Sequence, residues 1–196
     1  MAAQEDAEQY ELVVEAAGRL FVQLGYDGTS LQMIGEVAGM SAQEVSRLAQ
    51  DKRHVYLEVM TRYANAESAH MRAVMARVPP DVSGLQALVD GYLDYSVAHP
   101  ELRALWVHRW LNDAADVQDV EKLYRPLIAA VVEMFRGAVR ADYDLELGLW
   151  NIIWIVNGFI HVGVVDAEGI RRFADHPPTL RRFREYMHDM LERSAL

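Results

Sequence analysis

The stretch from Thr29 to Lys52 constrains the fold of this 196-residue sequence more than any other, because its pattern predicts two short helices joined by a tight turn. Gly39 lies at the expected bend, where glycine adopts a positive φ at the least cost. Gly35 is small at the point where the two helices would cross. The apolar positions of the pair are Ile34, Ala38, Met40, Val45 and Leu48. Together these features predict a helix-turn-helix.

Each helix of this motif also carries its own start signal. Thr29-x-x-Gln32 is expected to open the first helix. Ser41-x-x-Glu44 is expected to open the second as a capping box, in which each side chain bonds the backbone amide of the other residue. The caps, the spacing and the turn glycine therefore agree on one local structure.

The remaining pattern predicts an all-α protein of about nine helices, with no strand pattern and no repeat. Prolines mark several boundaries, because a proline disfavours helix in the residue before it. The expected helices outside the motif span 5–24, 52–78, 83–98, 101–111, 116–140 with a kink or break at Pro126, 142–165, and a last helix from Pro177 to about 193.

Charge and composition limit the possible partners and compartments. The formal net charge is −10, and residues 1–60 hold four Lys and Arg against ten Asp and Glu, a local charge of −6. DNA affinity comes largely from cations that neutralise phosphates, so any DNA binding is expected to be modest and strongly salt-dependent. The chain has no cysteine and no signal-peptide pattern at its N-terminus, which favours a cytoplasmic protein. Four polar residues interrupt the apolar run 145–165, which favours a buried helix and no membrane partner.

Two segments of the chain resemble the tetracycline-repressor (TetR) family of one-component transcription regulators. They are AAGRLFVQLGYDGTSLQMIGEVAGMSAQEV and the following DKRHVYLEV, which together cover about residues 12–60. The resemblance implies a helix-turn-helix DNA-binding domain over 1–51 and a ligand-binding and dimerisation domain over 52–196. It also implies a homodimer that binds operator double-stranded DNA, represses transcription, and is released by a small-molecule effector.

The candidate DNA contacts lie in and around the motif. Where the family usually has a lysine, a glycine and a threonine after the serine, and then a tyrosine and a histidine, this sequence has Ala42, Gln43, Glu44, Ser46 and Leu48. Glutamine can read adenine, glutamate can accept from cytosine, and arginine can meet guanine or a phosphate. Glu44 is better explained as the cap partner of Ser41. The predicted DNA-binding residues are Thr29, Ser30, Ser41, Gln43, Glu44, Ser46, Arg47 and Lys52.

The C-terminal part offers a mostly apolar pocket and a dimer surface. Aromatic side chains with polar tips fit a cavity for a largely apolar ligand, although each one alone is more often a core residue. Asn157 and His161 lie centrally in the apolar helix expected over 142–165. A buried polar group needs a partner, so each is expected to contact a ligand, another residue of the core or the second subunit at the dimer interface. The predicted ligand-binding residues are Tyr63, Tyr92, Tyr95, Trp106, Trp110, Tyr124, Phe135, Trp154, Asn157 and His161, and the predicted dimer residues are Trp150, Ile153, Phe159, Phe183, Met187 and Met190.

Two other functions stay open. The pairs Glu67-x-x-His70 and Glu185-x-x-His188 have the spacing used by di-iron carboxylate bundles, with Glu133 and Glu146 as further donors. Chance surface pairs explain them better, so we expect no enzyme activity, no cofactor and no metal site. The acidic N-terminal part and its atypical second motif helix favour, as the main alternative, a ligand sensor or partner-binding dimer of the same fold with impaired DNA binding.

Overall fold

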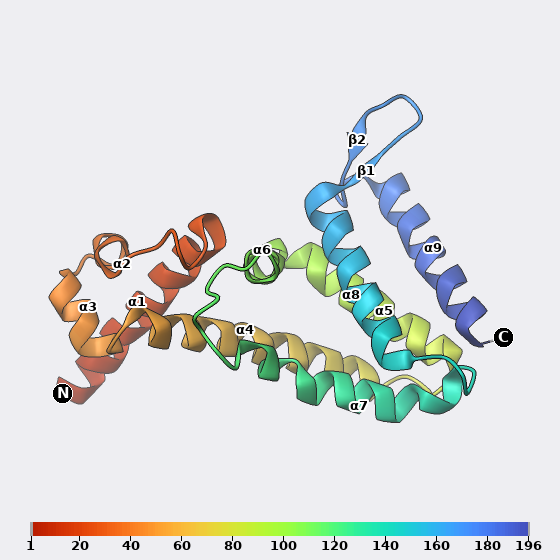
Figure 1. The fold of residues 1–196 in the computed structure, drawn as a ribbon, viewed down its shortest axis with the longest axis horizontal. Coiled ribbons are helices and arrows are strands. Elements are labelled where there is room, and N and C mark those ends of the chain that lie inside the picture. The colour runs from red at the N-terminus through yellow and green to blue at the C-terminus, as the bar shows by residue number, and fades with distance from the viewer. Residues whose placement is uncertain (1, 196) are drawn as a thin grey trace. The chain divides into compact units, whose positions relative to one another are not determined.

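The computed structural model describes residues 2–195 and is built almost entirely of helices (Figure 1). The α-helices are α1 (Ala2–Leu24), α2 (Leu31–Ala38), α3 (Ala42–Ala49), α4 (Lys52–Met75), α5 (Val82–Ala98), α6 (Pro100–Trp110), α7 (Arg125–Phe135), α8 (Leu145–Val162) and α9 (Pro177–Ala195). Two short 3-10 turns, η1 (Val120–Leu123) and η2 (Arg136–Ala138), flank α7. The predicted all-α class is confirmed.

Two expectations about individual elements are wrong. The helix expected over 116–140 forms only in part: residues 111–119 are a loop, and α7 begins at Arg125, with Pro126 in its first turn, where proline is well tolerated. A small antiparallel hairpin, which no strand pattern predicts, joins α8 to α9. It pairs β1 (Val164–Val165) with β2 (Arg171–Arg172).

The chain divides into two compact units. The head unit comprises the residues up to Asn65 together with Glu101–Leu123, and the body unit comprises Ala66–Pro100 and the chain from Tyr124 onward. The head unit therefore includes α6 and η1, although they come after α5, a helix of the body unit, in the sequence. The functional boundary at residue 51 stays a prediction.

The head unit is built around the contacts of α1 with α2 and α3. Val13, Ile34 and Val45, one from each helix, are fully buried in its core. Next to them the ring of Phe21 meets that of Tyr56 edge-on, with centroids 5.2 Å apart, and Tyr26 lies 4.9 Å from Tyr56. Burial raises the pKa of the Tyr56 hydroxyl well above its ordinary value.

The body unit has one apolar core formed by α5, α7, α8, α9 and the end of α4. Aspartates fix the starts of two of these helices: Asp81 accepts from the Gly84 amide at 3.0 Å at α5, and Asp144 accepts from the Leu147 amide at 3.0 Å at α8. Asp90 of α5 binds both Arg184, at 2.8 Å, and His188, at 3.0 Å, on α9. This polar seam fixes the register of α9 on α5.

Candidate functional site

The predicted helix-turn-helix is present in α2 and α3. Gly39 ends α2 in the left-handed conformation, with φ 73° and ψ 30°. A Cβ at Gly35 would lie 2.6 Å from the carbonyl oxygen of Met40, so the crossing of the two helices requires glycine. The capping box of α3 is complete: the Glu44 amide donates to Ser41 Oγ at 3.2 Å, and the Ser41 amide donates to Glu44 Oε2 at 2.8 Å.

The start of α2 differs by one residue from the prediction. Ser30 is the N-cap, and its Oγ accepts from the Met33 amide at 3.2 Å. Thr29 is 2 % exposed, and its hydroxyl donates to the Gly25 carbonyl at 2.7 Å. Thr29 therefore closes the turn before the helix, and its expected capping role is wrong.

The outward face of α3 carries few charges. Gln43 and Ser46 are exposed, as sequence-specific readers of base edges must be. Glu44 is exposed too, but its carboxylate is held by the Ser41 hydroxyl and amide, which lower its pKa below the ordinary range. Arg47 is also exposed and is paired with Asp6 of α1, with 2.9 Å between Nη2 and Oδ1. The helix therefore presents amide and hydroxyl groups more freely than cations.

Lys52 lies at the start of α4, and its ammonium is bound inside the head unit. Its Nζ donates to the carbonyl oxygens of Tyr26, at 2.8 Å, and Thr29, at 2.9 Å, and stands 4.0 Å over the centre of the Tyr26 ring. These contacts fix the segment 25–29, which leads into α2. The predicted phosphate contact of Lys52 stays a prediction, and a phosphate would share the ammonium with these two carbonyls.

Asp113 binds backbone amides of the same segment, residues 25–29. Its carboxylate accepts from the amides of Tyr26, at 2.7 Å, and Asp27, at 2.9 Å. Arg109 orders the loop that presents Asp113, because its guanidinium donates to the carbonyls of Ala114 and Val117 and to Glu121. Sequence reasoning missed both residues, since no local signal connects position 113 with position 26.

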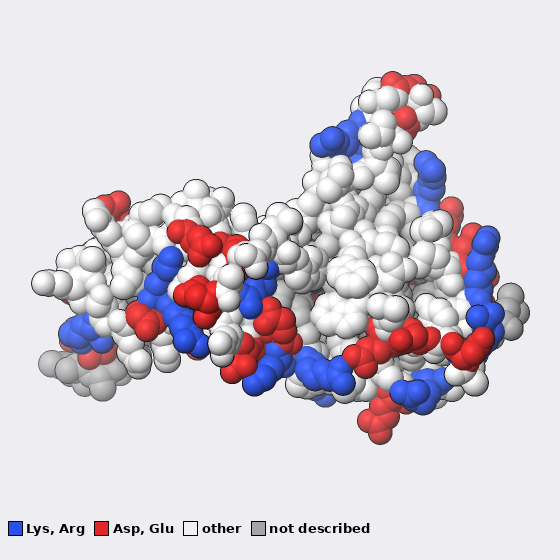
Figure 2. Space-filling view, in the orientation of Figure 1, with Lys and Arg blue, Asp and Glu red and all other residues white. Residues whose placement is uncertain are grey.

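The head unit as a whole is acidic. It contains eight Lys and Arg and fifteen Asp and Glu, a formal charge of −7. On the visible face of the molecule, Lys and Arg side chains are interspersed with Asp and Glu (Figure 2). A polyanion would therefore meet an electrostatically mixed surface.

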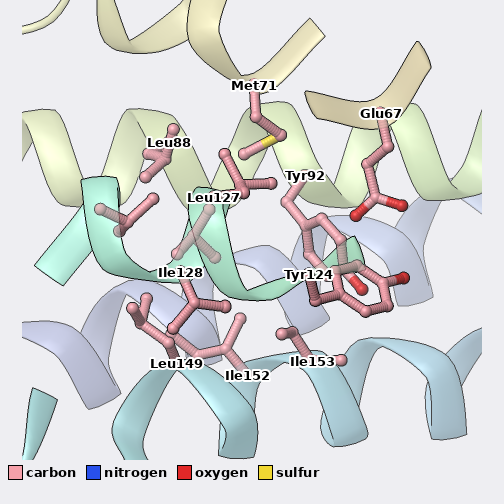
Figure 3. A pocket seen from close by; sticks show the side chains of 12 residues that line it. Glu67, Met71, Leu88, Tyr92, Tyr124, Leu127, Ile128, Leu149, Ile152 and Ile153 are labelled. Carbon is pink, nitrogen blue, oxygen red and sulfur yellow. The ribbon is translucent and has the colours of Figure 1, made fainter. Parts of the chain in front are cut away.

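The body unit has a small cavity of about 50 Å³ between α4, α5, α7 and α8 (Figure 3). Every lining side chain is buried. The residues that line it are Glu67, Met71, Leu88, Val89, Tyr92, Tyr124, Leu127, Ile128, Val131, Leu149, Ile152 and Ile153. Glu67, Tyr92 and Tyr124 lie at one end, and Leu88, Ile128 and Leu149 lie toward the other (Figure 3). The cavity is therefore apolar along most of its length, with polar groups at one end.

Of the predicted ligand-binding residues, Tyr92 and Tyr124 line this cavity. Asn157 lies directly behind it: its Nδ2 donates to the Tyr92 hydroxyl at 3.2 Å and to the Ile153 carbonyl at 2.8 Å. The others lie elsewhere. Phe135 is in the body core, Tyr95 lies between the rings of His70 and His99, Trp154 is 51 % exposed, His161 is half-buried on α8, and Tyr63, Trp106 and Trp110 belong to the head unit. Sequence reasoning missed Glu67 as a cavity residue and treated it only as part of a possible metal pair.

The predicted dimer residues fall into two groups. Ile153, Phe159 and Met187 are at most 7 % exposed, because they pack within the body core. Their side chains thus have no surface to offer a partner, and this part of the expectation is wrong. Trp150, Phe183 and Met190 are half-buried at the edge of the same core, and the ring of Phe183 stacks on Phe159 at 4.0 Å.

A different set of α8 side chains points away from the core. Leu147, Trp154 and Val162 are 56 %, 51 % and 59 % exposed. They follow one another at steps of seven and eight, so they share one face of the helix. By length and composition alone α8 could cross a membrane, and 39 % of its residues are buried inside the protein. Figure 2 shows a wide uncharged area over the body unit.

Among the described residues, the structure brings no metal ligand set together. Within residues 2–195, no three His, Asp or Glu side chains are placed to hold a metal ion. Glu133 is exposed, Glu146 pairs with Arg125, and His188 binds Asp90. The Glu and His side chains that a di-iron carboxylate site would need therefore do not come together at one site.

Comparison with known proteins places the fold. No family model and no curated protein sequence matches the chain. Solved structures do match: a TetR family transcription regulator from Marinobacter aquaeolei is 18 % identical with a TM-score of 0.67, over 98 % of this chain and 97 % of that one. The fatty acid degradation regulator FadR from Bacillus halodurans is 14 % identical, with a TM-score of 0.69, over 93 % and 94 %.

A third solved structure is that of AibR in complex with isovaleryl coenzyme A and operator DNA. It is 15 % identical to this chain, with a TM-score of 0.67, and the match covers 93 % of this chain and 97 % of that one. All three matches extend over both the head unit and the body unit. The chain therefore has the fold of the TetR-family transcriptional regulators.

Proposed function

We propose that the protein is a ligand-responsive transcriptional repressor that binds operator DNA as a homodimer through α2 and α3. A small, largely apolar effector binds in the body cavity and releases the DNA. The observation that carries this proposal is α4, one continuous helix whose first residue holds the segment leading into α2 and whose later residues line the cavity. Such a regulator acts where the DNA is, in the cytoplasm.

The α4 helix supplies a physical route from ligand to DNA. The cavity of about 50 Å³ is small for a drug-sized ligand, so a ligand of that size would displace the α4 side chains Glu67 and Met71. A displacement of α4 would reach Lys52 and the carbonyls it binds before α2. AibR, which has the same fold, forms a complex with isovaleryl coenzyme A and operator DNA, so this fold accommodates both kinds of partner.

The homodimer is supported by the outward face of α8. Leu147, Trp154 and Val162 expose a contiguous apolar face that would be costly to leave in water. A second copy of the chain covers this face in a two-fold arrangement, since an isologous interface pairs a surface with itself. The half-buried Trp150, Phe183 and Met190 would lie at the margins of this interface.

The test is binding of the purified protein to its own upstream DNA, followed by fluorescence anisotropy at several salt concentrations. Gln43→Ala should weaken specific binding by about 1–3 kcal/mol, roughly 5- to 150-fold, because a bidentate contact to a base edge is lost. Gln23→Ala, an exposed glutamine on α1, is the matched control. Equal affinity for unrelated DNA, unchanged by Gln43→Ala, would contradict operator recognition by α3.

A second candidate function is a ligand-binding dimer of this fold whose head no longer binds DNA. The charge of −7 on the head unit and the pairing of Arg47 with Asp6 favour it. A selection of bound fragments from the whole genome separates the two candidates. Recovery of a shared sequence supports the repressor, and recovery of none, from protein that still binds its ligand, supports the sensor.

A further inference from the structure

The hairpin that joins α8 to α9 has a fixed geometry. The carboxylate of Asp166 accepts from the backbone amides of Glu168, at 3.1 Å, and Ile170, at 2.7 Å. It also accepts from Arg172 Nε at 2.8 Å. Gly163, at the base of the hairpin, has a φ of 69°, and a Cβ there would lie 2.4 Å from the carbonyl oxygen of Arg172. The hairpin is therefore held closely at the end of α8, and it continues past that end (Figure 1).

One face of this hairpin carries an apolar side chain next to a cation. Val165 of β1 pairs with Arg171 of β2, so their side chains stand together on the same face. Both side chains are exposed. Within residues 2–195 no acidic side chain pairs with Arg171, whereas the neighbouring Arg172 binds Asp166. This face is suited to a surface that offers an apolar group beside a carboxylate.

Such a surface lies at the opposite end of α8. It is a hollow of about 380 Å³, lined by Tyr143, Asp144, Leu147, Gly148, Asn151 and Trp154. Asp144 and Leu147 are exposed and stand three residues apart, so they share one side of the helix. The hairpin cannot reach the hollow of its own chain, because the 18 residues of α8, about 27 Å, separate the two. The hollow of a second copy has no such restriction.

The exposed residues of α8 follow a palindromic order that defines how two copies fit together. These residues are Leu147, Asn151, Trp154, Gly158 and Val162. A two-fold axis that crosses the helix just after Trp154 places Leu147 opposite Val162 of the second copy. The same rotation places Asn151 opposite Gly158, whose missing side chain leaves open space. Since a two-fold interface pairs a surface with itself, this order favours two antiparallel α8 helices.

This rotation also brings the hairpin of one copy to the hollow of the other. Asp144 and Val165 are equally far along the chain from the point just after Trp154, so Val165 lies opposite Asp144 of the second copy. Leu147, one turn further along α8, then offers Val165 an apolar contact. Arg171, on the same face of the hairpin as Val165, comes close to the carboxylate of Asp144. The apolar and charged groups of the two surfaces are therefore complementary.

We propose that the hairpin of each copy docks in the hollow at the start of α8 of the other copy. Val165 packs on Leu147 of the second copy, and Arg171 binds the carboxylate of its Asp144. The proposal rests on the homodimer proposed above and extends it, because it assigns the hairpin as an arm that fixes the two α8 helices in an antiparallel register. Each dimer contains two such contacts, one at each end of the helix pair.

The test is cross-linking between single cysteines, which is clean because the chain contains no cysteine of its own. Full-length Val165→Cys and Leu147→Cys proteins, one of them tagged, are mixed, allowed to exchange subunits and treated with a short bismaleimide. We expect a covalent dimer of one chain of each kind on a denaturing gel. Neither protein alone should cross-link, because the two copies of Val165 would lie about 30 Å apart and those of Leu147 about 20 Å apart.

Two results would overturn the proposal. One is the absence of a covalent dimer from the mixture, and the other is efficient cross-linking of Val165→Cys with itself, which would indicate parallel helices. Arg72→Cys is the control for random collision: Arg72 is exposed on α4, which lies across the body cavity from α8 (Figure 3). It should cross-link with neither protein, and cross-linking as strong as that of the test mixture would remove the support for docking.

Charge reversal tests the contact of Arg171 separately. Arg171→Glu would face the carboxylate of Asp144 twice in each dimer, so the dissociation constant of the dimer in sedimentation equilibrium should rise about tenfold. The rise should shrink at high salt, which screens exposed charges. Arg72→Glu makes the same change at an exposed arginine of α4 and should alter the dissociation constant less than twofold. Equal effects of the two variants, both folded by circular dichroism, would overturn the assigned role of Arg171.

Failure of this proposal is distinguishable from failure of the proposed function. A protein that sediments as a dimer but gives no covalent dimer in the mixture keeps the homodimer and loses the hairpin contact. A protein that sediments as a monomer loses both. DNA binding is measured in neither experiment, so operator recognition by α3 is tested independently.

Discussion

The segment 25–29 in the head unit and the cavity in the body unit are fixed in opposite ways. The segment is held by directional polar contacts: Lys52 binds two of its carbonyls, and Asp113 binds two of its amides. The cavity is surrounded by apolar side chains whose contacts have no preferred direction. The first arrangement permits one geometry, whereas the second tolerates small rearrangements.

This difference matches two different tasks. A helix that reads base edges must be placed to within a fraction of an ångström, which rigid polar contacts achieve. A ligand site that must adapt needs side chains that can move at low cost. The predictions below test whether single substitutions in the head unit cause a large loss of stability, and whether the cavity accepts an added group without such a loss.

The largest effect is expected from Gly35→Ala in the head. The new Cβ would lie 2.6 Å from the Met40 carbonyl oxygen, so the helix crossing must open. The free energy of unfolding should fall by about 2–3 kcal/mol in urea denaturation, with loss of DNA binding. Gly137→Ala, where the Cβ meets no heavy atom of the described chain within 4 Å, is the control. Equal stability of the two variants would show that the crossing is not tight.

The second-largest loss of stability is expected from Asp113→Ala. It removes a charged acceptor from the amides of Tyr26 and Asp27, and leaves a buried residue with an unpaired amide. We expect a loss of about 2 kcal/mol, measured by the same denaturation. Asp116→Ala changes an exposed aspartate in the same loop and should cost little. If the two variants lose the same stability, the long-range contact of Asp113 does not fix the segment.

Val131→Ile, in the body unit, should increase the stability of the protein, in contrast to the two substitutions in the head unit. The added methylene can enter the cavity of about 50 Å³, so the free energy of unfolding should rise by about 0.5–1 kcal/mol. Binding of DNA should stay the same. Val78→Ile, which lies at the edge of the core and outside the cavity lining, is the comparison. A destabilised Val131→Ile protein would show that the cavity is less adaptable than we infer.

The smallest effect concerns the capping box and its dependence on pH. Hydrogen bonds from Ser41 lower the pKa of Glu44 below 4.5, so the folded state favours the carboxylate. The contribution of the Glu44 carboxylate to the stability of the folded state is present above pH 4.5, and it is lost as the pH falls through the lowered pKa. The stability difference between the wild type and Glu44→Gln should therefore shrink as the pH falls below about 4.5. A difference that is constant with pH would mean that the cap does not depend on the charge.

How far the sequence predicts this molecule depends on the range of its signals. The turn glycine, the capping box and the proline boundaries act within a few residues, and they predict α3, α5 and the helix-turn-helix correctly. The start of α2 is shifted by one residue, since Thr29 and Ser30 are both suitable caps and only the bond of Thr29 to Gly25 decides between them.

The failures involve contacts between residues far apart in the chain. The local pattern predicts a helix from residue 116, but the guanidinium of Arg109 binds the carbonyls of the loop 111–119 and Ala114 adopts a positive φ of 55°. The sequence predicts that the protein has an apolar cavity. It also predicts Tyr92 and Tyr124 as ligand-binding residues, and both line the cavity. Glu67 could not be predicted, because a charged residue at helical spacing is read as surface until the packing around it is known.

The burial of every side chain around the cavity has a consequence for time as well as for affinity. A ligand larger than this cavity of about 50 Å³ fits only after the surrounding helices separate, and such motions take microseconds to milliseconds. The rate at which an effector associates would then be set by how often the body opens, and not by how fast the effector diffuses. Departure would be slowed for the same reason, so the response to a brief exposure to the effector would outlast the exposure itself.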